Sequence, residues 1–128
     1  MTVVVDASFT VPACTVPDGF DRLAEDLIAP HLLWAEVRSV LHRSAWRGQV
    51  SWETARNAML QLDRVPIRAT KPRDLGSEAW AIADELGWAK TYDAEYLAVA
   101  RLSGARLLTL DVRMRRAAER VGIEIAEI

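Results

Sequence analysis

The sequence predicts an α/β fold in which a small, mainly parallel sheet lies between two layers of helices, in a three-layer α/β/α sandwich. Three observations predict it. The chain opens with the β-branched run Val3-Val4-Val5, which is apolar on both faces, like a central strand of a covered parallel sheet. A long middle section then has apolar residues at helical spacing, and strand and helix patterns alternate after it. The 128 residues are the length of one ordinary domain, so we expect a single domain over 1–128.

Local signals place the elements in order along the chain. Pro30 suits the first position of a helix, Ser51 is an N-cap residue, and Gly87 and Gly104 are typical helix ends. Pro66 restricts its short strand to a sheet edge. In chain order, we expect a strand within 2–7 that Asp6 ends, helices at 18–28, 30–47 and 52–62, a strand at 65–69, helices at 74–86 and 92–103, a strand at 106–110, a helix at 112–120 and a strand at 123–127.

Composition and charge narrow the class of protein. A net charge of −2 gives no whole-molecule reason to expect a polyanionic partner. No apolar run reaches the roughly 18 residues of a membrane span, and the first residues lack the pattern of a secretory signal. The single cysteine, Cys14, cannot form a disulfide within the chain, which is typical of a reducing compartment. We therefore expect a cytoplasmic protein without a membrane segment.

Two predicted strands deliver an acid to the same edge of the sheet. Asp6 follows the first strand, and Asp111 follows the strand at 106–110. The carboxyl edge of an open parallel sheet is where ligands bind. A strand-end Asp is also a common turn former or helix N-cap, and that structural role is the alternative for each residue alone.

Two further acids lie at the margins of buried structure. Glu36 stands beside the apolar stripe of LLWAEVRSVL, with no Lys or Arg at positions 32 or 40 to pair with it. An unpaired acid beside a buried face is unfavourable unless a cation meets it. Asp93 lies in the first turn of the helix that Thr91 opens, where the helix dipole also favours an acid.

Four carboxylates brought together repel one another and raise each other's pKa unless a divalent cation neutralises them. All-oxygen ligands select Mg²⁺, with Mn²⁺ as the second choice, and His31, His42 and Cys14 show no zinc-ligand spacing. Without these four acids the rest of the chain carries a net charge of +2. An acidic pit on a mildly basic body is the arrangement expected of a metal-dependent enzyme that acts on a phosphodiester.

The chain also resembles a PIN-domain protein, in particular a VapC-type toxin ribonuclease of a type II toxin–antitoxin pair. The likeness covers essentially the whole chain and is carried by the segments VVVDAS, LLWAEVRSVL, TYDAEYLAVARLSGARLLTLD and GIEI. It implies a three-layer α/β/α fold, Mg²⁺-dependent RNA endonuclease activity, homodimerisation and inhibition by a cognate VapB-type antitoxin.

The resemblance also implies roles for individual residues. The family's acidic metal-binding and catalytic positions fall on Asp6, Glu36, Asp93 and Asp111. Its supporting hydroxyl positions fall on Ser8 and Thr109.

One departure from the family pattern concerns the segment after Asp111. Some relatives carry a further acid there, whereas this chain has three arginines before Glu119, namely Arg113, Arg115 and Arg116. The number of metal ions, one or two, therefore stays open. We expect these arginines to contact RNA phosphates, although a solvated helix face is the alternative.

Other functions compete with this interpretation. A catalytically silent PIN-like scaffold that binds RNA or protein would have the same sequence pattern. A phosphoacceptor receiver domain needs regularly alternating strands and helices, which the helical character predicted for 20–62 opposes.

We expect the antitoxin to bind the early helices, which carry Trp34, Trp46 and Trp52 among apolar residues. Core packing or a homodimer contact is the alternative role of these side chains. The target RNA, its cleavage site and the identity of the antitoxin are not fixed by the sequence.

Overall fold

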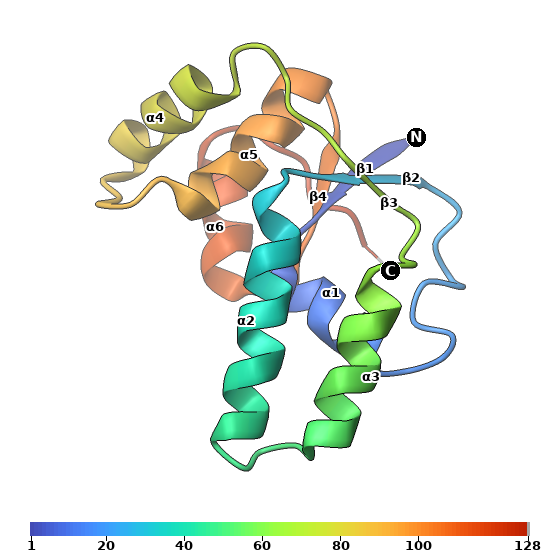
Figure 1. Cartoon of the computed structure of the whole chain (residues 1–128). Helices are drawn as coiled ribbons and strands as arrows, with labels where there is room; N and C mark the ends of the chain where they lie inside the picture. Colours follow the sequence, from blue (N-terminus) through green and yellow to red (C-terminus); the bar gives the residue numbers. More distant parts are fainter. Residues whose placement is uncertain (128) are drawn as a thin grey trace.

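The computed structural model describes residues 1–127 and contains a four-stranded parallel sheet (Figure 1). The strands are β1 (Thr2–Val5), β2 (Asp26–Ala29), β3 (Ile67–Ala69) and β4 (Arg106–Leu108), in the spatial order β3-β2-β1-β4. β1 lies inside the sheet, with Val4 opposite Ile28 of β2 on one side and Leu107 of β4 on the other. No helix among residues 1–127 has the length and apolar character to cross a membrane.

Six helices surround the sheet among the described residues. They are α1 (Ala7–Cys14), α2 (Leu32–Trp46), α3 (Trp52–Leu62), α4 (Leu75–Leu86), α5 (Tyr92–Ser103) and α6 (Val112–Arg120). α1, α2 and α3 pack on one another, α4 packs on α5, and α5 contacts β1 and β4. Figure 1 shows α2 and α3 as an antiparallel pair that extends away from the sheet.

The burial of β1 shows that both faces of the sheet are covered. Val3, Val4 and Val5 are 2%, 0% and 0% exposed. Successive side chains of a strand point to opposite faces, so three buried neighbours require helices on both sides. The predicted α/β class and its three layers are confirmed.

Most predicted helices are confirmed, with some of their end signals. Ser51 caps α3, since its hydroxyl accepts a hydrogen bond from the Thr54 backbone N–H at 3.0 Å. Gly87 and Gly104 end α4 and α5 in the left-handed conformation, with φ of 69° and 63°. Pro30 does not open a helix, because α2 begins at Leu32. The short strand near Pro66 does lie at a sheet edge, as predicted.

The prediction for the segment between Asp6 and Pro30 is wrong. Residues 7–14 form a helix that was not predicted, and the helix predicted at 18–28 is replaced by turns followed by β2. Leu27, Ile28 and Ala29 are all buried, as in a short strand covered on both faces. Apolar pairs such as Leu23 with Leu27 imitate a helical stripe over so short a length. Residues 20–62 contain a strand, but α2 and α3 still follow one another without a strand between them, so the described residues lack the regular alternation of a receiver domain.

The C-terminal strands are shorter than predicted. β4 ends at Leu108 instead of continuing to residue 110. The segment 123–127 forms only an isolated parallel bridge, in which Ile125 pairs with Leu107. Ile128, the last residue of the predicted single domain, lies outside the described residues.

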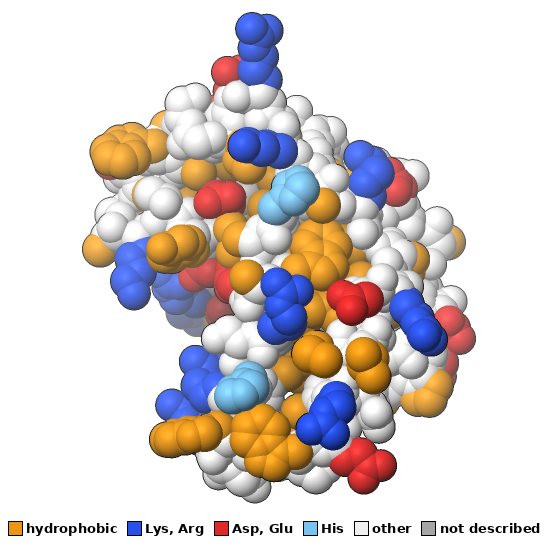
Figure 2. Space-filling view, viewed as in Figure 1, with side chains coloured by type: hydrophobic (Ala, Val, Ile, Leu, Met, Phe, Trp, Pro, Cys, Tyr) orange, Lys and Arg blue, Asp and Glu red, His pale blue; other side chains and the backbone are white. Residues whose placement is uncertain are grey.

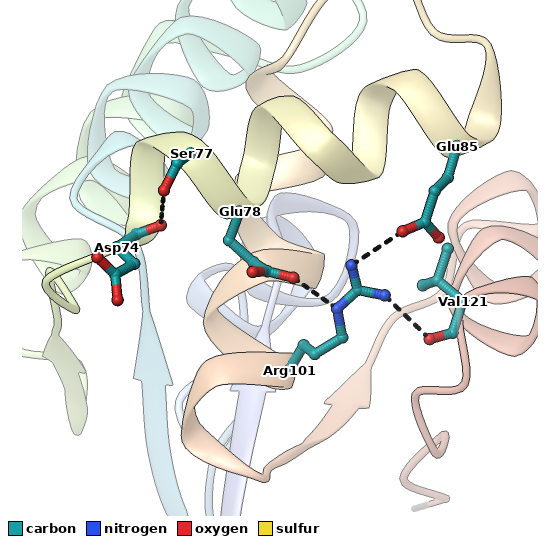
Figure 3. A network of polar contacts seen from close by, with 6 residues as sticks. All are labelled: Asp74, Ser77, Glu78, Glu85, Arg101 and Val121. Atoms are coloured by element: carbon teal, nitrogen blue, oxygen red, sulfur yellow. Dashed lines mark hydrogen bonds and ion pairs between the residues drawn. The ribbon is translucent and has the colours of Figure 1, made fainter.

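A half-buried arginine joins the ends of three helices (Figure 3). Arg101 of α5 donates from Nε to Glu78 of α4 at 2.7 Å and from Nη2 to Glu85 at 3.3 Å. Its third contact is the carbonyl oxygen of Val121, just after α6, at 3.4 Å. One guanidinium therefore fixes α4, α5 and the end of α6 relative to one another.

We predict that Arg101→Met lowers the free energy of unfolding by about 1–3 kcal/mol, because it leaves partly buried acceptors without their charged donor. The control is Arg68→Met. Arg68 pairs with Asp26 at 3.0 Å, but these side chains are 62% and 54% exposed, so its removal changes the same quantity by at most about 1 kcal/mol. Urea denaturation measures both. An equal loss in the two variants would contradict the role given to the Arg101 network.

Candidate active site

The candidate site begins where two neighbouring parallel strands, β1 and β4, end. Val5 of β1 lies opposite Leu108 of β4, so the next residues, Asp6 and Thr109, emerge side by side at the carboxyl edge of the sheet. Asp6 is 4% exposed and Thr109 is 1% exposed. The register of the sheet thus places a buried carboxylate beside a buried hydroxyl.

Hydrogen bonds hold both oxygens of the Asp6 carboxylate. Oδ1 accepts from the Ser8 hydroxyl at 2.7 Å and from the Phe9 backbone N–H at 3.2 Å, and Oδ2 accepts from the Thr109 hydroxyl. The bond from Phe9 also makes Asp6 the N-cap of α1. The Ser8 hydroxyl in turn accepts from the Leu110 N–H at 2.9 Å. Ser8 and Thr109, both predicted as supporting residues, therefore donate hydrogen bonds directly to the Asp6 carboxylate.

Burial has the largest effect on the pKa of the Asp6 carboxyl. It raises the pKa of this carboxyl above its ordinary value, and the charge of Asp111 raises it further. The bonds from Ser8, Thr109 and Phe9 oppose this shift without cancelling it. The site therefore contains negative charge that its neutral donors stabilise only in part.

Glu36 approaches Asp6 from α2. It is half-buried, and its Oε1 accepts a hydrogen bond from the Tyr96 hydroxyl of α5 at 3.1 Å. The Tyr96 phenol is thus the side chain that meets this half-buried carboxylate. Burial raises the pKa of Glu36, the Tyr96 bond lowers it, and the charges of Asp93, Asp6 and Glu95 raise it. The same environment raises the pKa of Tyr96 far above its usual range, chiefly through burial.

Asp93 and Asp111 lie at the starts of α5 and α6. Asp93 Oδ2 pairs with Nη1 of Arg113 at 2.9 Å, and the Arg113 guanidinium lies 4.3 Å from the centre of the Trp88 ring. Asp111 caps α6 by accepting from the Arg113 backbone N–H at 2.8 Å. The structural role considered for a strand-end Asp is thus present at Asp111 and at Asp6.

The three predicted RNA-binding arginines have different surroundings in the structure. Arg113 faces Asp93, Arg115 pairs with Glu127 at 3.1 Å, and Arg116 is exposed on α6. Arg113 and Arg115 are two apart on α6 and point to different sides, whereas Arg113 and Arg116, three apart, lie on the same side.

Sequence reasoning missed three residues at the site, namely Tyr96, Glu95 and Trp88. Tyr96 and Glu95 belong to the segment YDAEYL that carried the resemblance, so the signal was available there. Trp88 is partly buried against the core and precedes α5, and no spacing pattern connects it with Arg113. Tyr96 and Glu95 act directly on Glu36, the first by a hydrogen bond and the second by its charge, whereas Trp88 contacts Arg113, which pairs with Asp93.

The chemistry of the site fits a hard divalent cation. Its acids interact by charge, since Asp6 is affected by Asp111 and Glu36 by both Asp93 and Asp6, and all offer oxygen ligands. Among residues 1–127 no three Asp, Glu, His or Cys side chains are arranged to hold an ion as they stand. Asp93 in particular is turned to Arg113. The residue types therefore fit such an ion, and binding one would require the side chains to reorient.

Comparisons with known proteins cover nearly the whole chain. The family model of the PIN domain matches residues 3–120. The VapC ribonuclease Mb0985 of Mycobacterium bovis and Ribonuclease VapC9 of Mycobacterium tuberculosis are each 33% identical over 115 residues, which span 88% of this chain and 87% of each relative. The crystal structure of PAE2754 from Pyrobaculum aerophilum superposes with a TM-score of 0.75 at 27% identity, over 91% of this chain and 84% of that one.

The burial of Asp6 predicts a stability that depends on pH. Because the folded-state pKa of Asp6 is raised, its stabilising contribution is present below the ordinary value of 3.8 and is lost as the pH rises through the folded-state pKa. We expect Asp6→Asn, measured in EDTA, to melt at a higher temperature than the wild type at pH 7, and the gap to shrink towards pH 4.

Thermal denaturation at both pH values measures the gap, with Asp21→Asn at an exposed position as the control. A variant that is less stable than the wild type at pH 7 would show that the hydrogen bonds to Asp6 outweigh its burial.

Proposed function

This chain belongs to the VapC-type branch of the PIN-domain family, and we propose that it is a ribonuclease that acts as the growth-inhibiting toxin of a toxin–antitoxin pair. The observation that carries the proposal is the buried Asp6 carboxylate at the edge of the sheet, held by Ser8 and Thr109 and approached by Glu36. The relatives at 33% identity are named ribonucleases.

We propose that Mg²⁺, or Mn²⁺ in its place, is held by the four predicted acids, Asp6, Glu36, Asp93 and Asp111. Such an ion supplies an activated water and stabilises the charge that develops on the phosphodiester. Ser8 and Thr109 fix the direction of the Asp6 carboxylate, and Tyr96 fixes that of Glu36. Ligands held in this way need less reorganisation when they bind an ion.

The RNA is proposed to lie across the start of α6. Arg116 is exposed in the middle of α6, and Arg113 and Arg115 are the other candidate phosphate contacts, each paired with a carboxylate in the structure. Phosphate contacts position RNA, whereas sequence is read mostly in unpaired loops. The proposed substrate is therefore a structured RNA that is cut in a single-stranded loop.

An apolar groove between α2 and α3 is the proposed docking site of a VapB-type antitoxin. Its volume is about 800 Å³, and its lining includes Leu41, Ala55, Met59 and the two tryptophans Trp46 and Trp52. Trp46 is 74% and Trp52 is 48% exposed, so core packing does not account for them, whereas Trp34 packs against the core. Figure 2 shows hydrophobic side chains gathered at the far end of this helix pair, beside basic ones.

The charges around the groove indicate the chemistry of its partner. Arg38, Arg43 and Arg56 contribute to the lining of this apolar surface. An amphipathic helix with apolar anchors and acidic flanks would complement it. A homodimer is also expected, and sedimentation of the purified chain tests that part of the proposal.

We expect Asp6→Asn and Asp93→Asn each to lower the rate of RNA cleavage by roughly 100-fold or more, because each removes a charge proposed to stabilise the transition state. Thr109→Val, which leaves Asp6 in place, is expected to lower the rate by about 10-fold. Gel analysis of a labelled single-stranded RNA in Mg²⁺ and in excess EDTA measures these rates.

Circular dichroism of each variant controls for folding. A wild-type rate that is unchanged in EDTA would refute the metal-dependent mechanism. A wild-type chain that binds RNA but cuts none in Mg²⁺ or Mn²⁺ would favour the alternative, a catalytically silent scaffold.

We predict that the double variant Trp46→Ala, Trp52→Ala weakens binding of the antitoxin encoded beside this chain by about 30-fold or more, because tryptophans dominate binding at interface centres. Isothermal titration calorimetry measures the affinity. The matched control is Trp80→Ala, on the exposed face of α4, which is 67% exposed and lies outside the groove lining. Equal losses in the double variant and in the control would place the antitoxin elsewhere.

A further inference from the structure

Arg113 connects two of the proposed metal ligands. Its guanidinium pairs with Asp93 Oδ2 at 2.9 Å, and its backbone N–H donates to Asp111 Oδ1 at 2.8 Å. The guanidinium also lies over the Trp88 ring, 4.3 Å from the ring centre. Arg113 and Asp93 are 57% and 41% exposed, so both side chains have room to move.

The acids of the site differ in what holds them. Asp6 is held by hydroxyls and a backbone N–H, and Glu36 by the Tyr96 hydroxyl. Neutral donors leave the charge of a carboxylate available to a cation. Asp93 is instead held by a full positive charge, which both occupies Oδ2 and repels any second cation.

The Trp88 ring gives the arginine a defined resting place. A planar guanidinium stacks on an aromatic face, and that contact adds to the ion pair. Lysine offers no such planar stacking. Two contacts thus hold the Arg113 guanidinium in place, one with the Asp93 carboxylate and one with the Trp88 ring.

We propose that Arg113 is a built-in competitor for Asp93: it occupies this acid in the metal-free protein, stacked on Trp88, and leaves it when a divalent cation binds. The inference rests on the metal site of the proposed function. A released Arg113 is the same side chain that the proposed function assigns to an RNA phosphate. Metal binding would thereby expose a phosphate contact at the moment the site becomes active.

The first test measures metal binding without RNA. Mn²⁺ affinity, obtained by electron paramagnetic resonance of the free ion, is expected to tighten about 2- to 5-fold in Arg113→Gln, the range for loss of a partly exposed ion pair. Trp88→Leu removes only the ring and is expected to tighten binding by about 2-fold. The control is Arg120→Gln, which removes the same charge from α6 but loses only a bond to the Glu85 carbonyl oxygen at 3.4 Å.

The second test observes the arginine itself. In a ¹H–¹⁵N spectrum of the arginine side chains, the Arg113 signal is identified by its absence in Arg113→Gln. The Trp88 ring current is expected to displace this signal in the metal-free protein. Saturating Mg²⁺ is expected to move it towards the position of a free arginine, and in Trp88→Leu the part of this movement that comes from the ring current is absent.

The outcomes separate this inference from the proposed function. Metal binding that leaves the Arg113 signal in place, with equal Mn²⁺ affinities in Arg113→Gln and Arg120→Gln, overturns the competitor role even if the chain cuts RNA. Tighter Mn²⁺ binding in Arg113→Gln supports the competitor role even if no RNA is cut. Absence of Mn²⁺ binding in every variant overturns both the competitor role and the metal site.

Discussion

The Asp6 carboxylate is buried at the end of the central strand, and the arrangement of the site follows from how its two oxygens are held. One oxygen accepts from Ser8 and Phe9, which ties β1 to the start of α1, and the other accepts from Thr109, which ties β1 to β4. The parallel register of Val5 with Leu108 makes this second contact possible. A change of register would separate Asp6 from Thr109 and move Asp111 with it.

Burial places this carboxylate under electrostatic strain that the rest of the site increases. Desolvation raises the pKa of Asp6 and of Glu36, and the nearby acids raise both further. Such an arrangement opposes the stability of the free chain and favours the binding of a cation, a compromise that functional sites often show. Neutral hydroxyls fix the directions of Asp6 and Glu36 without removing their charge, whereas Arg113 neutralises Asp93.

The sequence predicted the parts of the fold and site that depend on local signals. Asp6 and Asp111 were found because each follows an apolar run, and Ser51 and Gly87 marked helix ends by their residue type. β2 was mistaken for a helix, because four residues of a buried strand are too few to establish a period. α1 was missed because β-branched residues and Pro12 lower the helix propensity of ASFTVPAC, which Asp6 and packing overcome. The contacts of Tyr96 with Glu36 and of Arg113 with Asp93 join residues 60 and 20 positions apart in the chain, so no local pattern reports them.

The central claim is that the acids around Asp6 hold a divalent cation, and anomalous diffraction from a crystal soaked in Mn²⁺ tests it most directly. Mn²⁺ takes oxygen ligands, like Mg²⁺, and its anomalous signal identifies the ion without reference to activity. The account predicts a peak coordinated by Asp6 and by at least one of Glu36, Asp93 and Asp111. A soaked crystal with no peak at Asp6, from protein that cuts RNA in the same buffer, would contradict it.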